Sequence, residues 1–156
     1  MIIYTDGACS TNGSWNGGAA IVVLDNSSNQ ICTEYTNSKN TTNNQMELTA
    51  VIMALEYIYN NSKEKEKNII YTDSAYIFNC INQKWYVKWR QNGWLTSKKT
   101  PVENRGLWER LLTFYEKCAI INIEKVKGHN GDEYNELADR LAVNARNNLN
   151  NTAEGE

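Results

Sequence analysis

The residues best suited to chemistry in this chain are two aspartates that end identical pentapeptides. The run Ile-Ile-Tyr-Thr-Asp occurs at residues 2–6 and again at 69–73. Both copies are apolar and β-prone, which predicts two short buried strands, each ending in a carboxylate where a turn begins. If these strands are parallel neighbours, about 4.8 Å apart, Asp6 and Asp73 emerge at the same edge of one sheet. Two carboxylates held that close repel each other unless a proton or a cation lies between them. The alternative is that the repeat is a chance use of common strand residues.

Two further carboxylates are candidates for the same site. Glu47 lies in the middle of the apolar stripe of a helix predicted over residues 45–59. There it either completes a capping box with Asn44 or points toward the sheet edge and a cation. Asp139 lies on a last helix, and helical periodicity by itself puts it roughly 130° from the centre of the apolar stripe, on the solvated face.

Carboxylates without a histidine or cysteine cluster indicate a hard divalent cation. Mg²⁺ prefers oxygen ligands, and two such ions can activate a water and stabilise the leaving oxygen of a phosphoryl displacement. His129 is the only histidine, and on a glycine-flanked loop it could move a proton or help to release product. The chain has no run of the G-x-x-x-x-G-K-[ST] type, which argues against a nucleotide-hydrolysing P-loop.

The elements that must position these residues alternate between strands and helices. Strands over 2–6, 19–24 and 30–36 have short connections, which predicts an antiparallel meander. A helix then leads to the second Ile-Ile-Tyr-Thr-Asp strand by a right-handed crossover. The rest reads as a short helix, a helix, a strand and a helix, at about 74–82, 100–118, 120–126 and 132–147. The helix over 100–118 is placed by a cap-like Thr100-Pro101-Val102-Glu103 start. The pattern predicts an α/β domain.

Bulk properties predict one domain over residues 1–147, followed by a flexible polar tail over 148–156. The chain has 156 residues, 41% hydrophobic and 22% charged, which is typical of a globular protein. No apolar run is long enough for a membrane span and the N-terminus lacks a signal pattern. Four scattered cysteines indicate reduced thiols, with no zinc site or disulfide framework. We therefore expect a cytoplasmic protein.

A local basic segment stands out against a formal net charge of −2. Residues 84–105 contain six basic residues and one acidic residue, Glu103, for a local charge of +5, whereas the rest of the chain carries −7. Three tryptophans, Trp85, Trp89 and Trp94, lie in the same segment. Basic side chains interleaved with aromatic ones suit a phosphate backbone and its sugars. Alternatively, the tryptophans are core residues and the lysines a solvated rim.

Five motifs together resemble ribonuclease H type 1. They are Tyr4-Thr5-Asp6-Gly7-Ala8-Cys9, Thr41-Thr42-Asn43-Asn44-Gln45-Met46-Glu47-Leu48, Thr72-Asp73-Ser74, Lys127-Gly128-His129-Asn130-Gly131 and Asn135-Glu136-Leu137-Ala138-Asp139. Their order and spacing, and the tryptophan-rich basic segment between them, match over residues 1–147. The resemblance implies a ribonuclease H-like fold, with a five-stranded mixed sheet flanked by helices and a basic helical protrusion over 84–99.

The resemblance also implies an activity and a set of site residues. The enzyme would be a monomer that cuts the RNA strand of RNA–DNA hybrids, leaving 5′-phosphate and 3′-hydroxyl ends, during removal of hybrids and RNA primers in replication and repair. Two Mg²⁺ ions, replaceable by Mn²⁺, would be held by Asp6, Glu47, Asp73 and Asp139, with His129 handling a proton. The implied hybrid contacts are Cys9, Asn12, Thr42, Asn43, Asn44, Trp85, Lys88, Lys98, Lys99 and Trp108.

Two departures from the family pattern bear on affinity, because Gln45 stands where a basic residue is common and Ala75 where a glutamine often contacts substrate. Two other functions compete with cleavage of hybrids. One is a hybrid-binding module without catalysis, which loss of a carboxylate would favour, and none is lost. The other is a nuclease of the same fold acting on DNA junctions or transposon ends, against which the long basic insert and the Thr-Thr-Asn-Asn motif argue.

Overall fold

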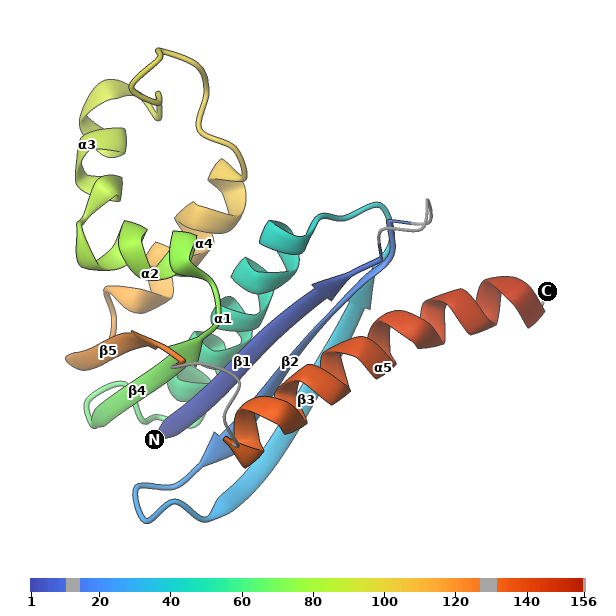
Figure 1. The fold of residues 1–156 in the computed structure, drawn as a ribbon. Coiled ribbons are helices and arrows are strands. Elements are labelled where there is room, and N and C mark those ends of the chain that lie inside the picture. The colour runs from blue at the N-terminus through green and yellow to red at the C-terminus, as the bar shows by residue number, and fades with distance from the viewer. Residues whose placement is uncertain (11–14, 127–131, 156) are drawn as a thin grey trace.

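The computed structural model describes residues 1–10, 15–126 and 132–155, with side chains up to Leu149. Its centre is a five-stranded mixed sheet in the order β3-β2-β1-β4-β5 (Figure 1). The strands are β1 (Ile2–Cys9), β2 (Gly17–Leu24), β3 (Gln30–Ser38), β4 (Lys67–Thr72) and β5 (Ile120–Lys125). The helices are α1 (Asn43–Asn60), α2 (Ala75–Asn82), α3 (Trp85–Asn92), α4 (Arg105–Tyr115) and α5 (Glu133–Gly155). The predicted fold class and the antiparallel meander are confirmed.

The two copies of the pentapeptide pair with each other as parallel neighbours. Ile2 aligns with Ile69, and the next two residues of each copy align in the same way, an offset of 67 residues. The Thr5 hydroxyl donates to the carbonyl oxygen of Tyr71 at 2.8 Å, which joins the strands just before their aspartates. The same offset carried forward sets Asp6 beside Asp73, so the repeat has a structural role and is not a coincidence.

The expected turn at Gly7 is wrong, because β1 continues through Cys9. Residues 6–9 pair with 17–20 of β2, so Asp6 lies inside a paired strand, whereas Asp73 follows the end of β4. A paired backbone holds Asp6 more firmly than a turn would. Gly7 makes the extension possible, since a Cβ there would lie 2.4 Å from the backbone nitrogen of Glu47 in α1.

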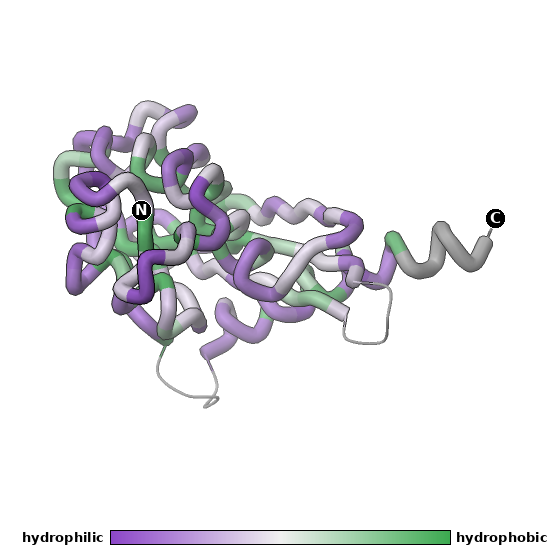
Figure 2. Tube along the Cα trace, turned by 90° about the horizontal axis from the view of Figure 1, so that it is seen from above, coloured by the Kyte–Doolittle hydropathy of each residue, from purple (hydrophilic) through white to green (hydrophobic). Residues whose placement is uncertain are grey.

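Helices cover both faces of the sheet. α1 packs on one face and α5 crosses the three antiparallel strands on the other (Figure 1). Every residue of β2 is buried because it lies between these helices. The larger core lies between the sheet, α1, α2 and α4, and a smaller one lies under α5. Hydrophobic stretches accordingly lie mainly in the interior, and hydrophilic ones on the outer helices and turns (Figure 2).

Several element boundaries differ from the predicted ones. α1 begins at Asn43, with Thr42 as N-cap and Gln45 completing the capping box, so the capping role considered for Glu47 is wrong. α4 begins at Arg105 and not near Thr100. The Thr100 hydroxyl bonds to that of Thr96 at 2.7 Å, and Pro101 forms an isolated bridge with Leu95, so neither is free to start a helix.

Two elements are longer than expected. β3 continues to Ser38 because it pairs with β2 as far as Gly17. α5 continues through Gly155, past the predicted end at Asn147, since no proline interrupts the polar residues that follow. Among the described helices, none is both long enough and apolar enough to cross a membrane.

Close packing of α5 on β2 predicts a large cost for a methyl group at Gly18. A Cβ there would lie 2.1 Å from the carbonyl oxygen of Ala142 in α5. Gly18→Ala should therefore lower the free energy of unfolding by about 1–3 kcal/mol, measured by urea denaturation. Gly106→Ala in α4 is the matched control. A Cβ there meets nothing within 4 Å, and a helical alanine is as stable or up to about 1 kcal/mol more stable. Equal stability of Gly18→Ala and wild type would contradict this packing.

Candidate active site and nucleic-acid surface

Three of the four candidate carboxylates surround one hollow at the sheet edge. Its volume is about 250 Å³ and its lining residues are all acidic or amide: Asp6, Asp73, Asp132, Asn135, Glu136 and Asp139. β1 supplies Asp6, the residue after β4 supplies Asp73, and α5 supplies Asp139. The structure therefore brings residues from three distant segments to one place, as the sequence motifs predict.

Glu47, the fourth candidate, does not line the hollow but contacts Asp6, which does. Both side chains are buried, with 8% of Asp6 and 5% of Glu47 exposed. The Gly7 amide faces both carboxyl groups and they share a hydrogen bond. The second oxygen of Glu47, Oε2, is buried without a hydrogen-bond partner among the described residues. A buried carboxylate oxygen without a partner is costly, so this position requires a proton or a cation.

The pKa values of these carboxyl groups reflect that cost. Burial, followed by the hydrogen bond and the charge of Asp139, raises the pKa of Asp6 to about 7. Burial, followed by the charge and hydrogen bond of Asp6 and the charge of Asp73, raises the pKa of Glu47 to about 9. The Gly7 amide lowers both values but does not offset burial. At neutral pH the pair therefore retains a proton that a divalent cation would displace.

The donor set fits a hard divalent cation. All the candidates offer oxygen atoms, and the orphaned Glu47 oxygen points to a missing positive partner. Within the described ranges, no three acidic, histidine or cysteine side chains already lie close enough to hold one ion.

Two of the four candidate carboxylates are exposed, in contrast to the buried pair. Asp73 and Asp139 are exposed, so they can approach a ligand with little loss of packing. Asp139 lies on the solvated face of α5, as periodicity indicates, but that face borders the hollow. His129 and Asn12 lie outside the described residues.

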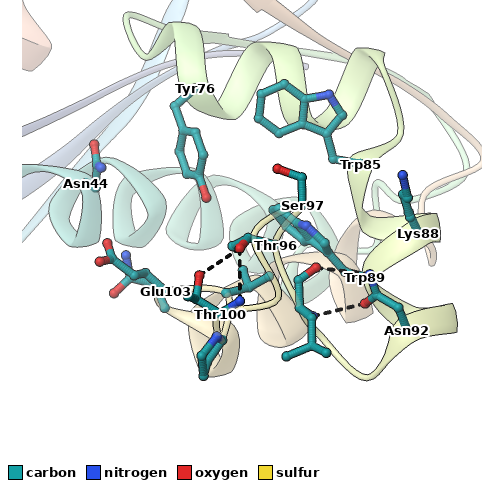
Figure 3. A pocket seen from close by; sticks show the side chains of 14 residues that line it. Asn44, Tyr76, Trp85, Lys88, Trp89, Asn92, Thr96, Ser97, Thr100 and Glu103 are labelled. Carbon is teal, nitrogen blue, oxygen red and sulfur yellow. Dashed lines mark hydrogen bonds between the residues drawn. The ribbon is translucent and has the colours of Figure 1, made fainter.

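A second, larger cavity lies between α2, α3 and the loop before α4. Its volume is about 590 Å³, and it brings together the predicted hybrid contacts Asn44, Trp85 and Lys88 (Figure 3). Aromatic rings of Tyr76, Trp85 and Trp89 form its apolar wall, whereas hydroxyl and amide groups supply hydrogen-bonding atoms. Such a mixture suits sugars and phosphates.

Trp108 does not line this surface, which corrects the sequence prediction. Its side chain is fully buried, and its ring packs edge-on against Tyr76 and Trp89 with centroids 5.7 Å apart. α4 directs it into the core, where it supports the aromatic wall from behind. Trp89 and Trp94 are also mostly buried, so the core interpretation holds for these two, whereas Trp85 stays half-exposed.

The positive charge of the protrusion comes from its lysines. Arg90 forms two hydrogen bonds to Glu116, at 2.9 and 2.6 Å, which tie α3 to the end of α4. Arg105 pairs with Glu109 and lies over the ring of Trp94. In contrast, Lys84, Lys88, Lys98 and Lys99 are exposed and have no ion-pair partner in the described part of the chain.

The start of α1 and the loop before α4 form a third hollow of about 600 Å³, lined by Thr42, Asn43, Asn44, Gln45, Glu103 and Asn104. Gln45 links its two sides. The Gln45 side chain accepts from the Thr42 amide at 3.2 Å and donates to Asn104 Oδ1 at 3.1 Å. Cys9 lies nearby, with its thiol donating to the Thr41 carbonyl at 3.3 Å. Gln45 is thus a brace in this chain.

Sequence reasoning missed several residues that line these cavities. The sequence motifs assign no site role to Tyr76, Asn104, Thr96 or Thr100, and Thr100 is interpreted there only as a helix cap. One sequence feature could have indicated them. Trp85 and Lys99 belong to the same short basic segment, so the loop between them can fold back over the aromatic residues.

Comparison with known proteins agrees with the geometry. The RNase H family model matches residues 1–147. Ribonuclease H of Caldanaerobacter subterraneus subsp. tengcongensis is 46% identical over 141 residues, covering 90% of this chain and 87% of that protein. Ribonuclease H of Caldicellulosiruptor saccharolyticus is 44% identical over 142 residues, covering 91% and 92%. The structure of LC9-RNase H1, a type 1 RNase H with the type 2 active-site motif, is 28% identical with a TM-score of 0.78, covering 94% and 72%. The chain therefore belongs to the RNase H family of endoribonucleases.

Proposed function

We propose that this chain hydrolyses the RNA strand of RNA–DNA hybrids by a two-metal in-line displacement that leaves 5′-phosphate and 3′-hydroxyl ends. The observation that carries the proposal is the buried Asp6–Glu47 pair, whose raised pKa values and orphaned oxygen call for a cation. Family membership supports the same reaction. The oxygen-only ligand set favours Mg²⁺, with Mn²⁺ able to replace it.

The buried and the exposed carboxylates would have different roles in holding the metal ions. Asp6 and Glu47 would hold the inner side of the metal site, because their positions are fixed by β1, α1 and the close approach at Gly7. Asp73 and Asp139 would close it from the exposed side. Bound divalent ions would activate water and stabilise charge on the leaving oxygen. His129 would accept or donate a proton near that oxygen.

The hybrid would lie across the carboxylate hollow and the aromatic cavity together. Asn43 and Asn44, exposed at the start of α1, would contact the minor groove, where 2′-hydroxyl groups mark the RNA strand. Asn12 would contact the same groove, Thr42 would help to hold a phosphate of the DNA strand, and Cys9 would line the binding surface. The aromatic cavity with Lys88, Lys98 and Lys99 would bind further along the backbone. We further propose that the enzyme acts as a cytoplasmic monomer in removing hybrids and RNA primers during replication and repair.

Loss of one carboxylate should abolish cleavage while sparing binding. Asp6→Asn or Asp73→Asn removes a negative charge from the proposed metal site without removing its shape, so cleavage of labelled hybrid in Mg²⁺ should fall by at least about 10³-fold. Hybrid affinity in Ca²⁺ should stay within about threefold of wild type. RNA duplex, DNA duplex and chelator reactions are the controls. Equal cutting of DNA duplex, or cutting in chelator, would refute the proposal.

The exposed lysines should set the salt dependence of binding. Replacing Lys88, Lys98 and Lys99 with Ala should weaken hybrid binding and reduce the slope of log K against log salt by up to about 0.9 per lost phosphate contact. The matched control replaces Lys63, Lys65 and Lys67 with Ala, which changes the net charge by the same amount. These lysines lie near the start of β4, and Asp73 follows the other end of that strand. Binding measured by fluorescence anisotropy should separate the two variants. An unchanged slope in the first variant would contradict the role of the protrusion.

A further inference from the structure

One acidic residue interrupts the otherwise neutral and basic lining of the aromatic cavity and of the hollow at the start of α1. Glu103 borders both the 590 Å³ cavity and the 600 Å³ hollow, and it is the one carboxylate among the described residues that line either. It is also the only acidic residue in the segment 84–105. Figure 3 shows Glu103 at the Asn44 side of the cavity and Lys88 at the opposite side.

The nearby groups do not neutralise this charge. Glu103 is exposed and forms no ion pair with any described residue. The nearest arginine in sequence, Arg105, is already paired with Glu109 and packed on Trp94. The carboxylate lies close enough to Tyr76 to act weakly on it: burial raises the pKa of Tyr76, the hydrogen bond with Trp108 lowers it, and Cys80 and then Glu103 add smaller increases.

A carboxylate is a poor neighbour for a phosphate backbone. It accepts hydrogen bonds but cannot donate them, whereas the hydroxyl and amide groups around it can donate to phosphate oxygens. Its negative charge also repels the phosphate, and this repulsion is strongest at low salt. An exposed glutamate far from a ligand would have no such effect, so the position of Glu103 between the two hollows is decisive.

We propose that Glu103 limits the affinity of this enzyme for the hybrid and so promotes release of the cut product. The inference rests on the proposed function, because it assumes that the hybrid binds along the 590 Å³ cavity and the 600 Å³ hollow that Glu103 borders. It assigns Glu103 an electrostatic role and no part in bond cleavage. Removing its charge while keeping its shape should therefore tighten binding, which is the opposite of the usual effect of altering a residue in a binding surface.

The test compares Glu103→Gln with Glu34→Gln. Glu34 is an exposed glutamate on the edge strand β3, at the far side of the sheet from α3, and its replacement changes the net charge equally. Hybrid binding in Ca²⁺ is measured by fluorescence anisotropy at about 50 mM and about 200 mM salt. Glu103→Gln should bind about threefold more tightly at the lower salt, with a smaller gain at the higher salt. Glu34→Gln should match wild type.

Kinetics in Mg²⁺ provide an independent readout. Compared with Glu34→Gln, Glu103→Gln should have a lower KM and slower multiple turnover at saturating hybrid, because the product leaves more slowly. Unchanged or weaker binding by Glu103→Gln, or an equal gain in Glu34→Gln, would overturn the inference. Failure of wild type to bind hybrid would instead refute the proposed function. If the three-lysine variant loses affinity while Glu103→Gln matches wild type, the inference on Glu103 alone fails.

Discussion

The structure depends on two carboxyl groups that are buried side by side without a positive partner among the described residues. Asp6 is fixed inside a paired strand and Glu47 inside the first turns of α1, so neither can swing into solvent without disturbing the core. Gly7 sets their separation, because any larger residue would push the strand from the helix. The fold thus holds the pair in an arrangement that is unfavourable by itself and favourable once a cation is bound.

The proposed nucleic-acid surface is built by different interactions from those of the carboxylate site. Its shape comes from buried aromatic packing, with Trp108 behind Tyr76 and Trp89, and from the Arg90–Glu116 pair that joins α3 to α4. The arginines of this segment form ion pairs within the protein, whereas its exposed lysines can contact a ligand. The shape and the charge of the surface therefore come from different residues. An overall acidic chain can in this way present a local basic surface to a polyanion.

The sequence predicted which carboxylates come together better than it predicted the local geometry. The doubled pentapeptide indicated a shared sheet edge, and the structure pairs the two copies in register. Glu47 was ambiguous, because its position on the apolar stripe fits both a cap and a buried ligand, and only the Thr42–Gln45 capping box resolves this. The predicted helix start at Thr100 is wrong because hydrogen bonds within the 94–102 loop, between Thr96 and Thr100 and from Val102 to Trp94, hold this segment out of a helix. The prediction that Trp108 lines the binding surface is wrong because composition cannot distinguish an aromatic residue that faces a ligand from one that packs behind such a residue.

The pH dependence of stability tests the buried pair most directly, with wild type and Glu47→Gln unfolded by urea in chelator and in saturating Mg²⁺. Carboxyl groups with pKa values of about 7 and about 9 retain protons in the folded state that the unfolded state has lost. The free energy of unfolding in chelator should therefore fall as the pH rises from about 5 toward 9. Near pH 8 Glu47→Gln should be more stable than wild type by roughly 1–3 kcal/mol, and Mg²⁺ should stabilise wild type more than the variant. Equal stability and identical pH profiles of the two proteins in chelator would contradict a buried carboxylate pair that awaits a cation.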